Sequence, residues 1–233
     1  TKMLAFPRFF FLSNDELLEI LAETKNPEKV QPYLKKCFDG VGKIEFSKEN
    51  GDILNAYDPG KDAETLPFYY EDCQHKMINP ANYHGNVEEW LVEVEAIMKK
   101  SMARCIDLCM EDFASGKSRN QWMQDWIGQA VIAVNQTMWT QEVEAAIREG
   151  EADPGSGTAK LAKALEAGVL KTVEVIRDPK VRKRLRTSIG ALIVMDVHNK
   201  EMVKELTVLK TARTTDFDWQ AQLRYYWKEG GES

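Results

Sequence analysis

Apolar residues recur every three or four positions in three long segments of the chain, which is the spacing of one face of an α-helix. The segments predicted to be long helices are residues 86–116, 119–148 and 181–210. Asn86 is a typical helix cap and Gly116 a typical helix stop, and only residues 116–118 connect the first two segments. A connection this short predicts that these two helices are antiparallel neighbours.

Shorter elements precede the first long helix. A helix begins at residues 13–14 and ends at Pro27, and a second runs from Gln31 to residues 40–42. Alternating apolar and polar residues then predict a small β-hairpin. Its parts are strands at 44–46 and 53–57, a turn at Asn50-Gly51, and an edge strand at 65–70 that contains Pro67, before a loop at 71–85.

The later part of the chain is less regular. Residues 149–157 hold three glycines and a proline and form the best internal break. A short helix is expected at 158–165, then a poorly patterned stretch to Pro179. The expected fold is mainly α, with stacked antiparallel long-helix bundles that form an elongated lever and a small β-hairpin near residues 44–70. The predicted parts are 1–85 with the short helices and hairpin, 86–150 with the long helix pair, 151–212 with the final helices, and the junction 213–233.

The composition argues against several classes of protein function. A formal net charge of −6 argues against a nucleic-acid binder, because such proteins usually carry a basic excess. No stretch approaches the roughly 18 apolar residues that cross a bilayer. The first twelve residues lack the features of a signal peptide. The chain begins at Thr1 with no initiator methionine, and hydrophobic residues follow at once, so we expect a segment of a longer protein. Four cysteines beside nine methionines fit a reducing compartment.

The sequence predicts no catalytic, cofactor-binding or metal-ligating residue. The glycine-rich stretch 153–160 lacks the spacing of a phosphate loop, and its glycines are better explained by a connection between helices. Cys105 and Cys109 fall on the apolar stripe of a predicted helix, where core packing is a better interpretation than zinc binding. The three histidines are scattered and define no triad.

One dense basic run stands out: Lys180, Arg182, Lys183, Arg184 and Arg186. A solvated helix face is the simpler interpretation. If the run has a function, an acidic protein surface is a better partner than nucleic acid, because no aromatic stacking groups are interleaved with it.

Four stretches occur in an order that resembles dynein heavy chains: residues 6–21, 30–38, 85–91 and 216–227. Together the four stretches span a region that resembles the carboxyl-terminal half of the dynein linker, up to the start of the first AAA+ module. The segment Phe10-Phe11-Leu12-Ser13-Asn14-Asp15 resembles axonemal, inner-arm-like heavy chains more than cytoplasmic ones.

This resemblance implies a mechanical role. The linker of that family is an arched stack of helical bundles on a ring of six AAA+ modules, and ATP hydrolysis in the ring bends and straightens it. The resemblance therefore implies that this chain holds no cofactor, whereas ATP and Mg²⁺ belong to the adjoining ring. The implied partners are the ring of the same heavy chain and, indirectly, microtubules and other dynein subunits. The implied location is the cytoskeleton of a ciliary or flagellar axoneme.

Within that role, the terminal aromatic segment is predicted to dock on the first AAA+ module, because it would otherwise be an exposed apolar patch. The predicted docking residues are Phe217, Trp219, Leu223, Arg224, Tyr225, Tyr226 and Trp227. Candidate hinges are Gly116, Gly155 and Gly157, since hinges sit at element ends. The alternatives are a stand-alone helical adaptor or scaffold that binds protein partners, and a small enzyme with an unrecognised spatial cluster.

Overall fold

The computed structural model describes residues 2–22 and 26–228. These residues divide into two compact units, the first ending at Cys105 and the second beginning at Ile106. The first unit combines short helices with a small sheet, and the second is helical. The expected mainly α fold with a small antiparallel sheet is therefore confirmed. None of the helices that the structure describes has the length and apolarity of a membrane span.

Short helices open the first unit. They are α1 (Lys2–Ala5), α2 (Asn14–Ala22), α3 (Gln31–Cys37) and the 3-10 turns Pro7–Phe11, Pro27–Val30 and Pro80–Tyr83. Ser13 starts α2 as predicted. Its Oγ accepts the backbone N–H of Glu16 at 3.3 Å, and the Glu16 carboxylate accepts the N–H of Ser13 at 3.0 Å. This reciprocal capping box satisfies two backbone donors that the first helical turn leaves unpaired.

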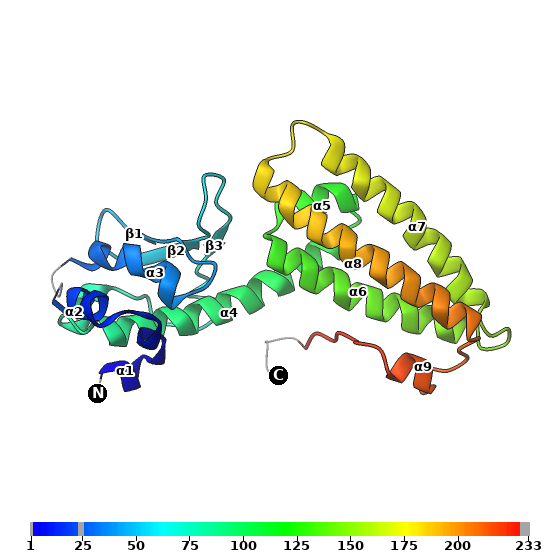
Figure 1. Cartoon of the computed structure of the whole chain (residues 1–233), viewed down its shortest axis with the longest axis horizontal. Helices are drawn as coiled ribbons and strands as arrows, with labels where there is room; N and C mark the ends of the chain where they lie inside the picture. The colour runs from blue at the N-terminus through cyan, green and yellow to red at the C-terminus, as the bar shows by residue number, and fades with distance from the viewer. Residues whose placement is uncertain (1, 23–25, 229–233) are drawn as a thin grey trace. The chain divides into compact units, whose positions relative to one another are not determined.

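The sheet of the first unit has three antiparallel strands in the order β1-β2-β3 (Figure 1). The strands are β1 (Lys43–Phe46), β2 (Ile53–Tyr57) and β3 (Thr65–Pro67). Gly51 adopts φ +81° between the first two, a conformation that favours glycine. Pro67 pairs with Asn55 at the end of the outer strand, where a residue without an N–H is tolerated.

An apolar core joins these elements to α4 (Val87–Ala114). Phe6 packs edge-on against Phe9, with ring centroids 5.0 Å apart, and lies 5.7 Å from Phe38. The predicted apolar stripe of α4 supplies Val87, Trp90, Leu91, Val94 and Ile97, all of them buried. The predicted long helix near 86–116 is therefore confirmed.

The second unit contains α5 (Arg119–Asp125), α6 (Gly128–Glu149), α7 (Ser156–Arg177), α8 (Lys183–Val208) and α9 (Phe217–Gln220). Figure 1 shows α6, α7 and α8 side by side, and the packing of α7 on α8 is the most extensive of the three. Cys105 and Cys109 are buried and unbridged on α4, as the core interpretation predicted. Burial raises the pKa of the Cys105 thiol to about 11.

Two predicted helix boundaries in this unit are wrong. The helix expected at 119–148 is interrupted at Trp126 and Ile127, which adopt extended conformations with ψ 156° and 144°. Trp126 donates its indole N–H to Asp112 on α4 at 2.7 Å. Trp122 of α5 likewise donates its indole N–H to the carbonyl of Cys109 on α4 at 3.0 Å, whereas α6 packs on α7 and α8. The break allows the two segments to make these different contacts.

The helix expected at 158–165 instead continues to Arg177 as α7. The apolar periodicity that predicts a helix is weak after residue 165, because inward positions of α7 carry small or polar residues in place of large apolar ones. Thr172 is buried and donates its hydroxyl to the carbonyl of Gly168 at 3.0 Å. A hydrogen bond within the helix satisfies this polar group without breaking the helix.

Candidate functional site

The C-terminal aromatic segment begins at a tight turn after α8. The Asp216 carboxylate accepts the backbone N–H groups of Ala212 and Arg213, each at 2.9 Å. These hydrogen bonds lower the pKa of Asp216, because they stabilise the ionised carboxylate. Three residues later Trp219 is 0% exposed, and its ring lies edge-on to Trp139 of α6 at 5.7 Å. The turn and this ring contact fix the point at which the segment leaves the helices.

Residues 225–227, which we call the strap, then pair with side chains of α6 and α4. The backbone N–H of Tyr225 donates to Thr140 Oγ1 at 3.0 Å, the Tyr226 hydroxyl donates to Glu144 Oε1 at 2.6 Å, and the Trp227 indole N–H donates to Asp107 Oδ1. Donation to the Glu144 carboxylate raises the pKa of Tyr226, because loss of the proton would place two negative charges together. The strap is therefore held on the unit from which it emerges.

These contacts change the predicted docking surface. Trp219 fills the core of its own unit, so its burial removes it from any surface that a separate module could contact. Phe217, Leu223 and Tyr226 are 81%, 76% and 59% exposed. Docking by these three residues and by the half-buried Arg224 stays a prediction.

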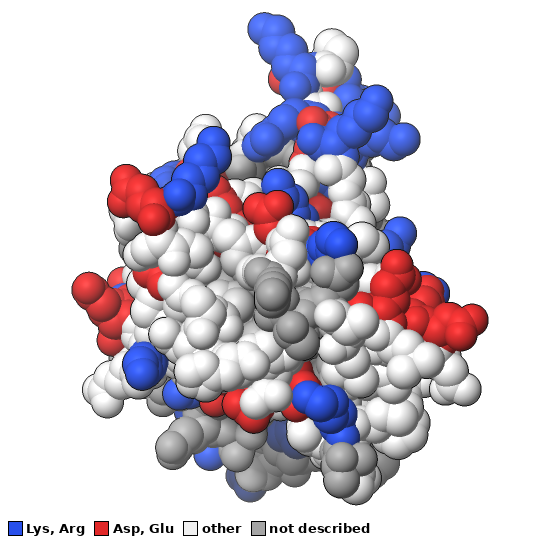
Figure 2. Space-filling model, turned by 90° about the vertical axis from the view of Figure 1, so that its left-hand side faces the viewer, with Lys and Arg blue, Asp and Glu red and all other residues white. Residues whose placement is uncertain are grey.

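The predicted basic run covers the turn after α7 and the start of α8, and we call Lys180, Arg182, Lys183, Arg184 and Arg186 the basic turn. All five side chains are exposed. Figure 2 shows Lys and Arg side chains gathered over this turn, which is the highest part of Figure 1. The basic turn and the segment after α8 lie at opposite ends of α8, about 39 Å apart at 1.5 Å per residue over its 26 residues.

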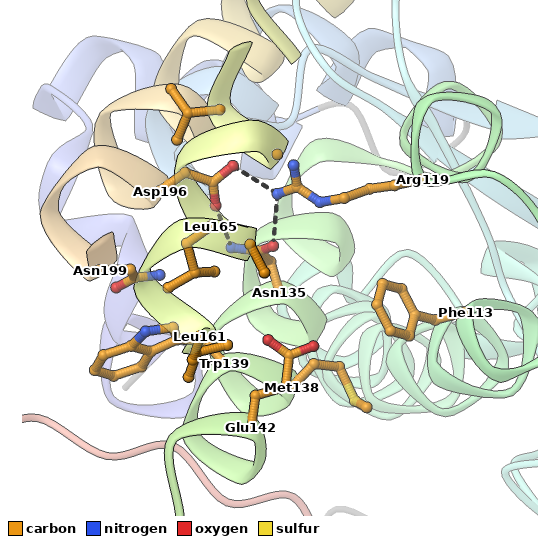
Figure 3. A pocket seen from close by; sticks show the side chains of 13 residues that line it. Phe113, Arg119, Asn135, Met138, Trp139, Glu142, Leu161, Leu165, Asp196 and Asn199 are labelled. Atoms are coloured by element: carbon orange, nitrogen blue, oxygen red, sulfur yellow. Dashed lines mark hydrogen bonds and ion pairs between the residues drawn. The ribbon is translucent and has the colours of Figure 1, made fainter. Parts of the chain in front are cut away.

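A polar cluster between α5, α6, α7 and α8 was not predicted. The Arg119 guanidinium forms an ion pair with Asp196 of α8 at 2.6 Å. It also donates to Asn135 of α6 at 2.8 Å and to Thr172 of α7 at 2.7 Å. Asn135 in turn donates to Asp196 at 3.0 Å (Figure 3). One arginine thus connects four helices.

A second pair extends this cluster. Asn199 of α8 donates to the Gln136 side chain of α6 at 2.6 Å, and both residues are buried. Asp196 and Asn199 fall among the inward positions of α8, beside Leu192 and Val203. A charged or amide residue at an apolar position of a predicted helix could have indicated a buried polar contact. The sequence could not show which residue is its partner.

A cavity of about 240 Å³ adjoins the cluster. Phe113, Met138, Leu161 and Leu165 form apolar walls, and Glu142 directs its carboxyl toward the cavity from an accessible position (Figure 3). Desolvation raises the pKa of Glu142, and the charge of Arg119 opposes that effect. The Arg119 guanidinium already binds three partners, so it does not offer an unpaired positive charge to a ligand in the cavity. Among the described residues, no His, Cys, Asp and Glu side chains gather in a group that could hold a metal ion.

The candidate hinge glycines differ in their surroundings. A Cβ atom on Gly157 would lie 2.0 Å from the carbonyl oxygen of Ala146, and one on Gly155 would lie 2.9 Å from that of Thr207. Gly155 also adopts φ +96°. A Cβ on Gly116 would meet no atom within 4 Å, although its φ is +84°. Close packing therefore accounts for Gly155 and Gly157, and a hinge role for the three stays a prediction.

Comparison with known proteins places these features in a family. Residues 1–109 match the family model described as "Dynein heavy chain, N-terminal region 2". The chain is 43% identical over 226 residues to dynein axonemal heavy chain 3 of Homo sapiens, and 40% identical over 228 residues to dynein axonemal heavy chain 12 of Homo sapiens. Dynein axonemal heavy chain 1 of Mus musculus is 38% identical over 227 residues. Each match covers 97% of this chain, which spans only 5%, 7% and 5% of the respective relatives.

Proposed function

This chain belongs to the dynein heavy-chain family, and from that premise we propose that it is a segment of the motor's linker that acts as a lever. The observation that carries the proposal is the strap. A lever must pass displacement to the chain that follows it, and residues 225–227 are tied to α6 and α4 by three side chains. Pulling on the strap therefore loads the helices directly.

The helices of the second unit support this role. Buried Trp139 and Trp219 connect α6 to the segment after α8, and Arg119 joins four helices through hydrogen bonds and an ion pair. Such contacts resist sliding of one helix past another, because sliding would leave buried polar groups without partners. Stiffness is what a lever needs between its ends.

Energy for the movement comes, in this proposal, from ATP and Mg²⁺ in the adjoining AAA+ ring. This chain then works as part of a microtubule motor together with other dynein subunits. The similarity to axonemal heavy chains supports a location in the axoneme of a cilium or flagellum.

The test is to release the strap in the full heavy chain without disturbing the core. Thr140→Val, Tyr226→Phe and Trp227→Phe together remove an acceptor and two donors. Volume is nearly kept at positions 140 and 226, and an aromatic ring, although a smaller one, is kept at position 227. We expect the motor to keep its ATP turnover but to move microtubules several-fold more slowly, because displacement is no longer passed on fully. Microtubule gliding and ATPase assays on the same preparation measure both quantities.

The matched control replaces the exposed Phe217 and Leu223 by Ala. Slower gliding only in the strap variant supports a lever that acts through the strap. Slower gliding only in the control variant supports docking of the exposed residues on the ring instead. Unchanged gliding in both variants rejects a mechanical role for this segment.

A further inference from the structure

The basic turn concentrates positive charge on a chain whose formal net charge is −6. Five cationic residues lie within seven positions, and all are exposed at the tip formed by the end of α7 and the start of α8 (Figure 2). The neighbouring Arg177 in the last turn of α7 adds a sixth. These like charges repel one another, because they are concentrated in one short segment.

The position of the basic turn increases this repulsion. The N-terminus of a helix carries a partial positive charge, so cations there are unfavourable. Helix α8 starts with Lys183 and Arg184, has no acidic residue in its first turn, and receives no side-chain cap from Arg182. A sequence that served only to form α8 would place Asp, Glu, Ser or Thr at these positions.

The cations of the turn are not equivalent. Arg186 donates to the carbonyl oxygens of Asp178 and Val181 at 3.1 and 3.3 Å, and the Asp178 carboxylate accepts the backbone N–H of Lys180 at 2.9 Å. Arg186 and Asp178 thus hold the shape of the turn. The side chains of Lys180, Arg182 and Lys183 form no hydrogen bond or ion pair with any residue in the described part of the chain.

We propose that the basic turn is a docking surface for a carboxylate-rich segment of another protein, with Lys180, Arg182 and Lys183 as the contact residues. Carboxylates would relieve both the mutual repulsion and the unfavourable helix terminus. Nucleic acid fits less well, because no aromatic residue stands within the turn to stack on a base and the rest of the chain repels a long polyanion. The inference does not depend on the lever role.

The experiment is a fluorescence anisotropy titration of the 233-residue chain with a labelled oligo-glutamate peptide. Lys180→Glu with Lys183→Glu reverses two charges in the turn. The control, Lys163→Glu with Lys171→Glu, makes the same chemical change at exposed positions of α7. An oligo-glutamine peptide and a single-stranded DNA of matched charge are the reference ligands.

We expect the unaltered chain to bind oligo-glutamate, with affinity that falls steeply as salt is raised from about 50 to 150 mM. The double variant in the turn should bind at least about tenfold more weakly, whereas the α7 control should stay within about twofold. Oligo-glutamine should not bind. Equal losses in the two variants, tighter binding of DNA than of oligo-glutamate, or no binding at low salt would each overturn the proposal.

Folding of the variants is checked by thermal unfolding followed by circular dichroism. The double variant in the turn should melt at or above the temperature of the unaltered chain, since glutamates suit the start of a helix better than lysines. If it fails to fold, Lys180→Gln with Lys183→Gln provides the same comparison without charge reversal, and undiminished binding by that variant would contradict the assignment.

Discussion

The two units are stabilised in different ways. The core of the first unit is a continuous set of apolar side chains in which Phe6 contacts both Phe9 and Phe38. The helices of the second unit bury polar groups between them, with Arg119 and Asp196 at the centre. Apolar contacts depend little on direction, whereas hydrogen bonds and ion pairs require one alignment of the helices.

This difference fits the proposed mechanics. A purely apolar interface between long helices tolerates small shifts, because one methyl group can replace another. A buried ion pair contributes less to net stability than its Coulomb attraction suggests, but a shift that separates its partners is costly. We therefore infer that the polar cluster keeps α5 to α8 in a single register, while the apolar core of the first unit supplies most of that unit's stability.

The largest expected effect lies in the first unit. Phe9→Ala should lower the free energy of unfolding by about 3 to 5 kcal/mol, because it opens a cavity at a fully buried site. The neighbouring Phe10→Ala, at a side chain that is 65% exposed, should change it by less than about 0.5 kcal/mol. Urea unfolding, with hydrogen exchange to follow each unit separately, measures both. Similar losses at the two positions would show that the packing described for this core is wrong.

A smaller effect is expected at the polar cluster. Arg119→Met or Asp196→Leu alone should cost about 2 to 3 kcal/mol, since each leaves a largely buried charge without its partner. The double variant should recover much of that loss, because two apolar side chains can pack where the ion pair was. Urea unfolding of all four proteins gives the coupling energy. Losses that simply add would mean that the two residues act independently.

The smallest expected changes in stability are at two glycines of α7, and they have opposite signs. Gly157→Ala should destabilise the chain by about 1 to 3 kcal/mol, because its Cβ would collide with the carbonyl oxygen of Ala146. Gly168→Ala, where a Cβ meets nothing within 4 Å, should stabilise the helix by about 0.5 to 1 kcal/mol. Thermal unfolding of the two variants measures both signs. A gain from Gly157→Ala would remove the close-packing explanation for this glycine.

The sequence was informative where apolar residues decide the structure. The stripe of α4, the helix start at residues 13–14 and the edge strand with Pro67 followed from spacing and residue type. The full length of α7 did not, because Gly168 and Thr172 occupy positions where a pattern of large apolar residues would have marked the helix.

Polar pairs between residues far apart in the chain could also not be predicted from the sequence. Arg119 and Asp196 are 77 positions apart, and either could have been a solvated surface charge. The break at Trp126 depends on its contact with Asp112, which spacing within one helix cannot reveal. The terminal aromatics were identified as an anchor, but only the structure showed that Trp219 packs on the chain's own Trp139.

If this chain is a lever, as proposed, the helices and the strap of the second unit move as one body while the motor turns over ATP. Single-molecule energy transfer in the full heavy chain tests it, with one dye at the exposed Val194 of α8 and the other at the exposed Leu223 or in the adjoining ring. We expect a constant distance between Val194 and Leu223, and a distance from Val194 to the ring that changes with nucleotide. A Val194–Leu223 distance that changes with nucleotide, or a constant distance to the ring, would contradict the proposed lever.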